Sequence, residues 1–256
     1  MTGDREQALV FGEIATEYER VRPGYPTALI DDVIAYAPGD PAALDIGAGT
    51  GKATVAFAER GVRIIALEPD PAMAVVLGER VAGHSVNIAV ASLENHEPAE
   101  PYDLVYSAQA FHWTAPETRW ARTASVLRPG GALALFWNHD QLADLAVRDR
   151  VFGVLREQAP MLAPAGEPHE PEELLKHWPQ DELIKQPEFG EFRQQVYRWE
   201  RELSRADYLA YLTTQSAYRM LDDEVRQALV DELQTVLPEQ VVLDVATLLY
   251  LAKRRC

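Results

Sequence analysis

A short apolar stretch near residue 45 runs directly into three alternating glycines, Gly47, Gly49 and Gly51. The stretch reads Ala43-Leu44-Asp45-Ile46, and a helix-like pattern follows the last glycine. Glycine adopts the positive φ angles of a tight strand-to-helix turn, and its missing side chain lets backbone amides come close to a ligand. The pattern therefore predicts a parallel-sheet fold with a ligand site at the end of its first strand.

Two common glycine-rich turns do not match this spacing. A dinucleotide-binding turn that begins at Gly47 needs its third glycine at position 52, where Lys52 stands. A phosphate-binding loop that ends at Gly51-Lys52 needs glycine at position 46 and serine or threonine at position 53, where Ile46 and Ala53 stand. The turn is therefore expected to hold a different kind of ligand.

Short apolar runs alternate with helix-like stretches over the first half of the chain. Strands are expected at residues 42–46, 63–67, 86–90, 102–107 and 131–137, with helices at 53–60, 71–81 and 116–126. This alternation is typical of a parallel sheet with crossover helices.

We expect one domain over residues 1–256, since this length lies within the range of a single large α/β domain. An N-terminal helical cover is expected at 1–36, a cofactor-binding core at 37–140, a helical lid at 141–190 and 204–240, and the last strands of the sheet at 191–203 and 241–256. Two helices are expected between residues 205 and 237.

Forty acidic and 24 basic residues give a net charge of −16, which disfavours binding to nucleic acid or to anionic membranes.

No apolar run is long enough to span a membrane and the N-terminus lacks a signal-peptide pattern, so we expect a cytoplasmic protein. The only cysteine is Cys256 and the six histidines are scattered, so neither a disulfide nor a metal site is expected.

An acid, Glu68, lies 23 residues after Asp45, at the end of the second predicted strand. In a doubly wound sheet this position lies beside the first turn, where a carboxylate can accept hydrogen bonds from both hydroxyls of a ribose. The alternative is a surface or helix-capping acid, because Pro69-Asp70-Pro71 begins a helix.

Together, Asp45, the three glycines and Glu68 resemble the cofactor motifs of class I S-adenosylmethionine-dependent methyltransferases. Residues 102–107 resemble the fourth strand of that family, and Leu127-Arg128-Pro129-Gly130-Gly131 resembles the turn before its fifth. The resemblance implies an α/β, Rossmann-like, doubly wound, seven-stranded, mostly parallel sheet with a helical lid. It also implies S-adenosylmethionine as cofactor.

The resemblance carries cofactor roles to particular positions. Met73 is expected to line the adenine side, and the alternative is an ordinary core residue. Ser92 stands where many relatives have an acid that bonds the adenine amino group, so that contact is open to Ser92, the Leu93 backbone or Glu94. The cofactor set is Tyr18, Arg22, Asp45, Gly47, Gly49, Gly51, Glu68, Met73, Ser92, Leu93 and Ser107.

The segments at 11–26 and 110–113 resemble a subgroup that includes trans-aconitate methyltransferase-like proteins. In that subgroup the first segment covers the cofactor, so Arg22 is expected to hold the methionine carboxylate; the alternative is a helix whose Tyr18 and Arg22 only pack. The second segment contains His112, a candidate general base that could instead only hold a loop.

Substrate contacts are expected from aromatic and polar residues at strand ends and in the last third of the chain. Each could equally be an ordinary core or surface residue. The set is Tyr25, Trp113, Trp137, Tyr211, Gln215 and Tyr218.

The sequence thus predicts a methyltransferase that transfers a methyl group by in-line displacement to a small-molecule acceptor, through an oxygen atom. Two alternatives remain at this point. One is an NAD-dependent oxidoreductase, which Lys52 disfavours. The other is a module that binds S-adenosylmethionine without transferring its methyl group.

Overall fold

The computed structural model describes residues 14–164 and 170–256. Part of the expected N-terminal cover, residues 1–13, and part of the expected lid, residues 165–169, lie outside the described residues. The start of the segment 11–26 is likewise outside them.

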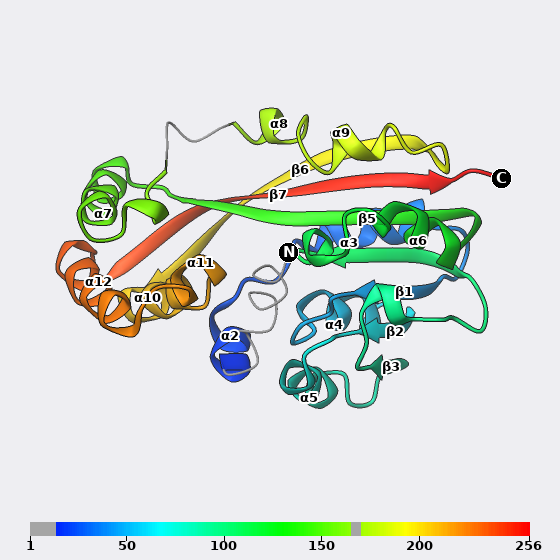
Figure 1. Ribbon diagram of the computed structural model, residues 1–256, viewed down its shortest axis with the longest axis horizontal. Coiled ribbons are helices and arrows are strands. Elements are labelled where there is room, and N and C mark those ends of the chain that lie inside the picture. The colour runs from blue at the N-terminus through cyan, green and yellow to red at the C-terminus, as the bar shows by residue number, and fades with distance from the viewer. Residues whose placement is uncertain (1–13, 165–169) are drawn as a thin grey trace. The chain divides into compact units, whose positions relative to one another are not determined.

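The described residues form a seven-stranded sheet in the order β3-β2-β1-β4-β5-β7-β6 (Figure 1). The strands are β1 (Ala42–Ile46), β2 (Arg63–Leu67), β3 (Val86–Ala89), β4 (Tyr102–Ala108), β5 (Leu127–Leu142), β6 (Phe189–Ser204) and β7 (Gln240–Arg254). The pairs β1–β2, β1–β4, β2–β3 and β4–β5 are parallel. Strand β7 runs against β5 and β6, so the sheet is mixed (Figure 1).

The strand order reverses between β1 and β4, and β1 pairs with β2 on its other side. This reversal is the topological switch point at which doubly wound folds bind their ligands. The expected Rossmann-like α/β fold is therefore confirmed.

The helices lie between the strands and in the second half of the chain. They are α2 (Ala15–Val21), α3 (Thr27–Tyr36), α4 (Lys52–Ala58), α5 (Pro71–Arg80), α6 (Arg119–Val126), α7 (Leu145–Gln158), α8 (Pro171–Leu174), α9 (Gln180–Leu183), α10 (Arg205–Thr213), α11 (Ser216–Arg219) and α12 (Asp223–Val236), with 3₁₀ turns η2 (Leu93–Asn95), η3 (Phe111–Trp113) and η4 (Pro160–Leu162). None of the helices in the described ranges is long and apolar enough to cross a membrane.

The chain divides into two compact units. One unit, called the helical unit here, comprises the described residues of Met1–Arg22, His139–Glu170 and Arg198–Ala246. The other, the sheet unit, comprises Pro23–Asn138, Pro171–Tyr197 and Thr247–Cys256. Residues 171–190, which we expected in the lid, thus belong to the sheet unit. Strands β5, β6 and β7 each contribute residues to both units.

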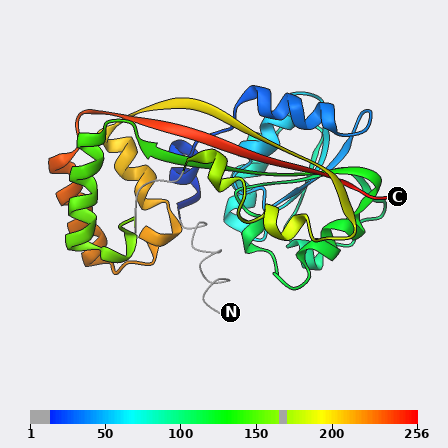
Figure 2. The same cartoon turned by 90° about the horizontal axis from the view of Figure 1, so that it is seen from above.

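The sheet unit buries apolar side chains on both faces of its strands, and Figure 2 shows α3 on one face and α6 on the other. The α4 residue Phe57 stacks on Tyr106 of β4 at 4.3 Å between ring centroids, and Phe136 of β5 lies next to that pair. All three rings are fully buried. Burying a side chain of this size stabilises the fold by about 2–3 kcal/mol, so this cluster fixes how α4 lies on the sheet.

The helical unit has a core of its own. Val151 and Leu155 of α7 pack in one buried cluster with Leu209 of α10 and Leu229 and Leu233 of α12. On α7 and on α12 the two named residues are four positions apart, which places them on one face of each helix.

Two expected elements differ in extent from the structure. Residues 205–237 form three helices rather than two, because Gln215 and Asp222 adopt extended backbone angles that end each helical segment. Strand β5 was expected at 131–137 but covers Leu127–Leu142, since the sheet continues through the polar residues that follow Trp137.

Candidate functional site

The predicted glycine turn connects β1 to α4 at the switch point. Gly47, Gly49 and Gly51 have φ angles of +70°, +58° and +93°, which residues with a side chain rarely adopt. The amides of Gly47 and Ala48 both donate to the Leu67 carbonyl at 2.9 Å, so the end of β2 holds the turn.

The glycines differ in the room around them. A Cβ atom on Gly47 would lie 2.4 Å from Ala110 Cβ, whereas one on Gly49 would meet only Met73 Cε at 3.8 Å. Gly47 is therefore required by packing against the loop after β4, while Gly49 leaves open space beside Met73.

Glu68 follows β2 and faces the same turn. Its Oε2 accepts from the Gly49 amide at 2.7 Å and its Oε1 from the Asp70 amide at 2.8 Å. The residue is 7% exposed, and this burial raises the pKa of Glu68 to about 7, although the two amide donors oppose the rise. The structure thus brings Gly49, Glu68 and Met73 together.

Asp45 lies at the end of β1 and is fully buried. Its Oδ2 accepts from the Thr54 hydroxyl of α4 at 2.6 Å. The buried Tyr106 hydroxyl is the second hydrogen-bonding neighbour of Asp45. Burial raises the pKa of Asp45 to about 7, although the Thr54 and Tyr106 hydroxyls oppose the rise. Asp45 therefore ties the turn to α4 from inside the fold.

The remaining cofactor candidates of the sheet unit lie at the same strand ends. Ser107 is fully buried and donates to the Ile46 carbonyl at 2.8 Å, which joins the end of β4 to the end of β1. Leu93 is buried in η2, and Ser92 precedes it with a half-buried side chain. Contacts of Ser92 and Leu93 with an adenine stay predictions.

His112 lies in η3 within a group of tryptophans. Its ring centroid is 4.5 Å from that of Trp113 and 6.4 Å from that of Trp178, and the Trp137 Nε1–H points at His112 Nδ1 from 3.5 Å. Trp137 and Trp178 meet edge to face at 5.3 Å. His112 is an exposed residue, and the protein atoms around its ring, together with the charge of Arg119, lower the pKa of His112.

Trp178 and Arg119 were not among the residues predicted from the sequence. Arg119 is 5% exposed, donates to the Thr114 carbonyl at 2.9 Å and lies over the Trp178 ring at 5.4 Å. The only sequence signal for Trp178 was an aromatic residue within a charged, proline-interrupted segment.

Tyr25, a predicted substrate residue, lies edge-on to Phe136, with 4.8 Å between the ring centroids.

The other predicted residues belong to the helical unit. Arg22 lies 4.9 Å from the Tyr18 ring centroid and 5.3 Å from that of Tyr211. Tyr211 and Tyr218 are buried, while Gln215 is half-buried. The structure therefore groups Tyr18, Arg22 and Tyr211 within this unit.

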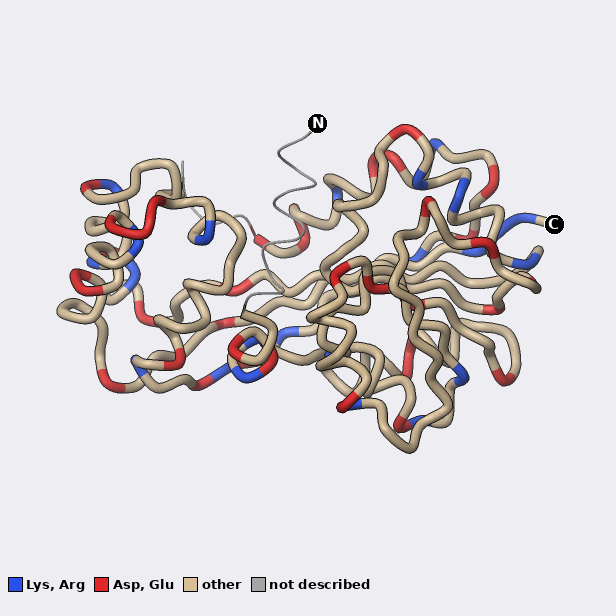
Figure 3. Tube along the Cα trace, turned by 60° about the horizontal axis from the view of Figure 1, so that its bottom comes forward, with Lys and Arg blue, Asp and Glu red and all other residues tan. Residues whose placement is uncertain are grey.

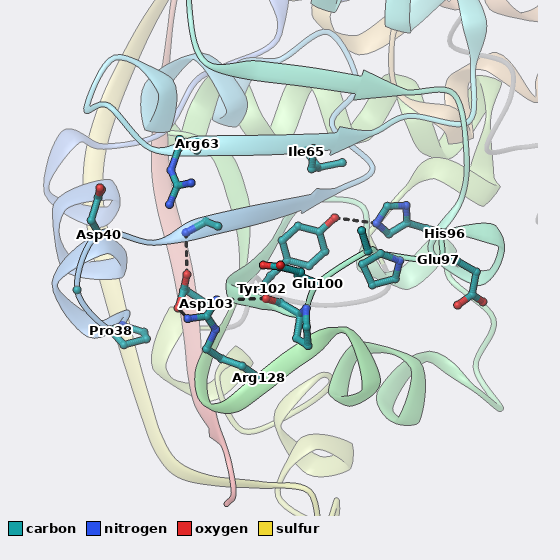
Figure 4. A pocket seen from close by; sticks show the side chains of 15 residues that line it. Pro38, Asp40, Arg63, Ile65, His96, Glu97, Glu100, Tyr102, Asp103 and Arg128 are labelled. Carbon is teal, nitrogen blue, oxygen red and sulfur yellow. Dashed lines mark hydrogen bonds and ion pairs between the residues drawn. The ribbon is translucent and has the colours of Figure 1, made fainter.

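A pocket of about 700 Å³ lies at the opposite ends of the strands (Figure 4). It is bordered by Arg63 at the start of β2, Tyr102 and Asp103 at the start of β4, and Arg128 in β5. Arg128 pairs with Asp103 at 2.7 Å. Because ligands of doubly wound folds bind at the carboxyl ends of the strands, this pocket is separate from the predicted cofactor site.

Across residues 14–164 and 170–256, no group of three or more histidine, cysteine, aspartate or glutamate side chains is arranged to hold a metal ion.

Comparison with known proteins identifies the chain's family. A methyltransferase-domain profile matches residues 44–135. Uncharacterized methyltransferases of Mycobacterium bovis and Mycobacterium tuberculosis are 37% identical over 166 residues, covering 64% of this chain and 63% of theirs. An uncharacterized methyltransferase of Geobacillus kaustophilus is 30% identical over 57% of this chain and 70% of its own length.

Among solved structures, a candidate type II methyltransferase from Anaeromyxobacter dehalogenans is similar, with a TM-score of 0.62 and 26% identity over 91% of this chain and 97% of that one. The chain spans just under two thirds of the length of the mycobacterial relatives. Fold and glycine turn together define a class I, S-adenosylmethionine-dependent methyltransferase domain. The chain belongs to the methyltransferase family, and S-adenosylmethionine is the cofactor of its domain.

Proposed function

We propose that the protein transfers a methyl group from S-adenosylmethionine to an oxygen atom of a small-molecule acceptor. The observation that carries this proposal is the grouping of Gly49, Glu68 and Met73 at the switch point of the sheet. When bound, S-adenosylmethionine supplies an electrophilic methyl group on a sulfonium. Direct displacement then needs the acceptor oxygen, methyl carbon and sulfur in line, so positioning provides much of the rate.

The residues of the turn fit this cofactor. The open space beside Gly49 admits a flat nucleoside next to Met73, whose thioether suits an aromatic base. The Glu68 carboxylate, held by two backbone amides, retains lone pairs for a ribose diol. Asp45 is fully buried beside Thr54 and Tyr106 and supports the turn that would hold the cofactor.

The charge of the chain supports a small acceptor rather than a polymer. A net charge of −16 repels nucleic acid phosphates and anionic lipids. Figure 3 shows acidic and basic residues interspersed along the coloured part of the trace, without a continuous basic stretch. The resemblance to trans-aconitate methyltransferase-like proteins supports the same conclusion. We therefore propose an acceptor that is neither nucleic acid nor membrane.

We propose His112 as the general base and Trp113 and Trp137 as walls around the acceptor. The indole N–H of Trp137 can only donate, and its 3.5 Å contact with His112 Nδ1 is long for a hydrogen bond. Trp137 therefore orients the His112 ring and has to give way when Nδ1 takes the proton of the acceptor.

Calorimetric titration with S-adenosylhomocysteine, with NAD in parallel, tests the cofactor assignment. We expect saturable one-to-one binding of S-adenosylhomocysteine alone, followed by methyl transfer in a screen of small hydroxyl and carboxyl compounds. Binding without turnover on any acceptor would favour a module that only holds the cofactor. Binding of NAD alone would favour an oxidoreductase.

The His112→Ala variant is expected to lower turnover by about two to four orders of magnitude while leaving affinity for S-adenosylhomocysteine near that of the parent. His84→Ala is the matched control, since His84 is exposed in the same unit and lies in the turn before β3. Steady-state kinetics on an acceptor from the screen measure the effect. Equal turnover in His112→Ala and parent would rule out the base and favour an acceptor that is already ionised.

A further inference from the structure

The pocket of about 700 Å³ at the starts of the central strands lies wholly within the sheet unit (Figure 4). Its walls come from the loop after α3, the starts of β2 and β4, the loop before β4, and β5. The glycine turn lies at the opposite, carboxyl ends of the strands. Pockets that bind small molecules usually enclose about 300–1,000 Å³, so this one has room for a ligand of its own.

Part of the charge that lines this pocket is already paired. Asp103 accepts from the Ala42 amide at 2.9 Å and pairs with Arg128 at 2.7 Å. Glu97 pairs with Arg122 of α6 at 2.8 Å. Each ion pair is neutral as a whole, so neither decides the charge of a ligand.

Another part of the lining is uncharged. The His96 ring stacks on the Tyr102 ring with 6.0 Å between centroids, and His96 Nε2 lies 2.9 Å from the Tyr102 hydroxyl. Burial lowers the pKa of His96, so its imidazole is neutral at neutral pH. Ile65 and Pro98 add apolar surface. The pocket can therefore contact an apolar group as well as polar ones.

Three charged side chains of the lining are left: Arg63 on β2, Asp40 in the loop before β1, and Glu100 in the loop before β4. All three are exposed, and within residues 14–164 and 170–256 none of them forms a hydrogen bond or an ion pair through its side chain. Figure 4 shows the Arg63 side chain pointing toward Asp103. In the described chain, one unpaired cation and two unpaired acids thus border the same pocket.

These unpaired charges disfavour a ligand that carries charge of one sign only. An anion on Arg63 would be repelled by Asp40 and Glu100, and an amine on the two acids would be repelled by Arg63. A molecule with both groups meets both demands, because its carboxylate accepts from the guanidinium and its ammonium donates to a carboxylate. A phosphate dianion fits worse, since the two acids outnumber the arginine.

We propose that this pocket binds an amino acid with an apolar side chain, as a zwitterion. Arg63 holds the carboxylate, Asp40 or Glu100 holds the ammonium, and the apolar side chain lies against Tyr102 and Ile65. The site is separate from the methyl-transfer site and does not depend on the proposed function.

The test is calorimetric titration of the full chain with leucine and with phenylalanine. Saturating S-adenosylhomocysteine is present throughout, so that neither amino acid can occupy the amino-acid end of the cofactor site. For the amino acid that binds more tightly, two analogues separate its charges: the amide lacks the carboxylate, and the desamino acid lacks the ammonium.

The variants are Arg63→Gln, Asp40→Asn and Glu100→Gln. Lys185→Gln and Glu79→Gln are the matched controls for the loss of one charge, because both residues are exposed in the same unit and lie outside the pocket lining. Circular dichroism melts confirm that each variant is folded.

We expect saturable binding by the parent and a loss of affinity of about 10- to 100-fold in Arg63→Gln and in one of the two acid variants. The two controls should bind as the parent does, and both analogues should bind at least about 10-fold more weakly than the amino acid itself.

A parent protein that binds neither amino acid overturns the proposal. Binding that Arg63→Gln leaves unchanged also overturns it, as does binding that neither acid variant weakens. Equal affinity for the desamino acid would identify a simple anion site instead.

Discussion

The Gly47→Ala variant is expected to lose about 3 kcal/mol of unfolding free energy, the sum of a left-handed backbone penalty and a steric contact. Its φ of +70° is unfavourable for alanine, and the new Cβ would lie 2.4 Å from Ala110 Cβ. The loop after β4 must therefore move away from the turn. Urea unfolding measures the stability, and we expect affinity for S-adenosylhomocysteine to fall with it.

Gly61→Ala is the control that separates the two effects. Gly61 has a φ of +81°, and its added Cβ would meet nothing within 4 Å, so this variant is expected to lose only about 1 kcal/mol. Combining Gly47→Ala with Ala110→Gly is expected to recover the steric part of the loss, because it removes the atom that Cβ would meet. Equal losses in Gly47→Ala and Gly61→Ala would show that the Ala110 contact does not limit the turn.

The Glu68→Gln variant is expected to weaken S-adenosylhomocysteine binding by about 10- to 100-fold. The substitution keeps the size of the side chain but replaces one acceptor oxygen by an NH₂ group. Both carboxylate oxygens already accept from the Gly49 and Asp70 amides, so the NH₂ group must face one of those donors or the ribose. Calorimetry measures the affinity.

Asp103→Asn is the matched control for Glu68→Gln. Asp103 is also a buried acid that accepts from a backbone amide, that of Ala42 at 2.9 Å, but it lies at the start of β4, away from the turn. It should lower stability without changing cofactor affinity. If both variants weaken binding equally, the effect of Glu68 is one of folding rather than of ribose recognition.

The raised pKa of Glu68 gives this interaction a pH dependence. The carboxyl group must be ionised to accept from both ribose hydroxyls, so binding should strengthen as pH rises through about 7. The ligand-free protein should show the opposite trend. An acid with a raised pKa in the folded state stabilises the fold below its unfolded pKa, and this stability is lost as pH rises through about 7. Glu68→Gln should flatten both profiles.

The first half of the fold was predictable because local signals there agree with one another. The apolar run before Gly47 gives β1, the glycines give the turn, and Glu68 follows a second run that gives β2. The ends of β5 and β6 were harder to predict. The polar residues after Trp137, and Phe189 and Gly190 before the expected start at 191, look like loop, and they are strand because neighbouring strands supply their backbone partners.

Several features of the candidate site could not be read from the sequence. Trp178 reaches His112 from a segment 66 residues away, and no pattern in that segment indicates the contact. Arg63 is one charged residue at the start of a short apolar run, and only the structure shows that it borders a pocket with Arg128. Such contacts depend on tertiary distances, whereas the glycine turn depends on local backbone geometry.

Because β5, β6 and β7 each contribute residues to both units, the chain crosses between the units within three of its strands, and it also crosses outside strands after Arg22 and after Glu170. Neither unit is one uninterrupted stretch of sequence. A chimaera with a relative would therefore have to exchange residues 1–22, 139–170 and 198–246 together, with three of its cuts within strands and in matching register. The glycine turn, Glu68 and the proposed acceptor residues His112, Trp113 and Trp137 would all stay with the host.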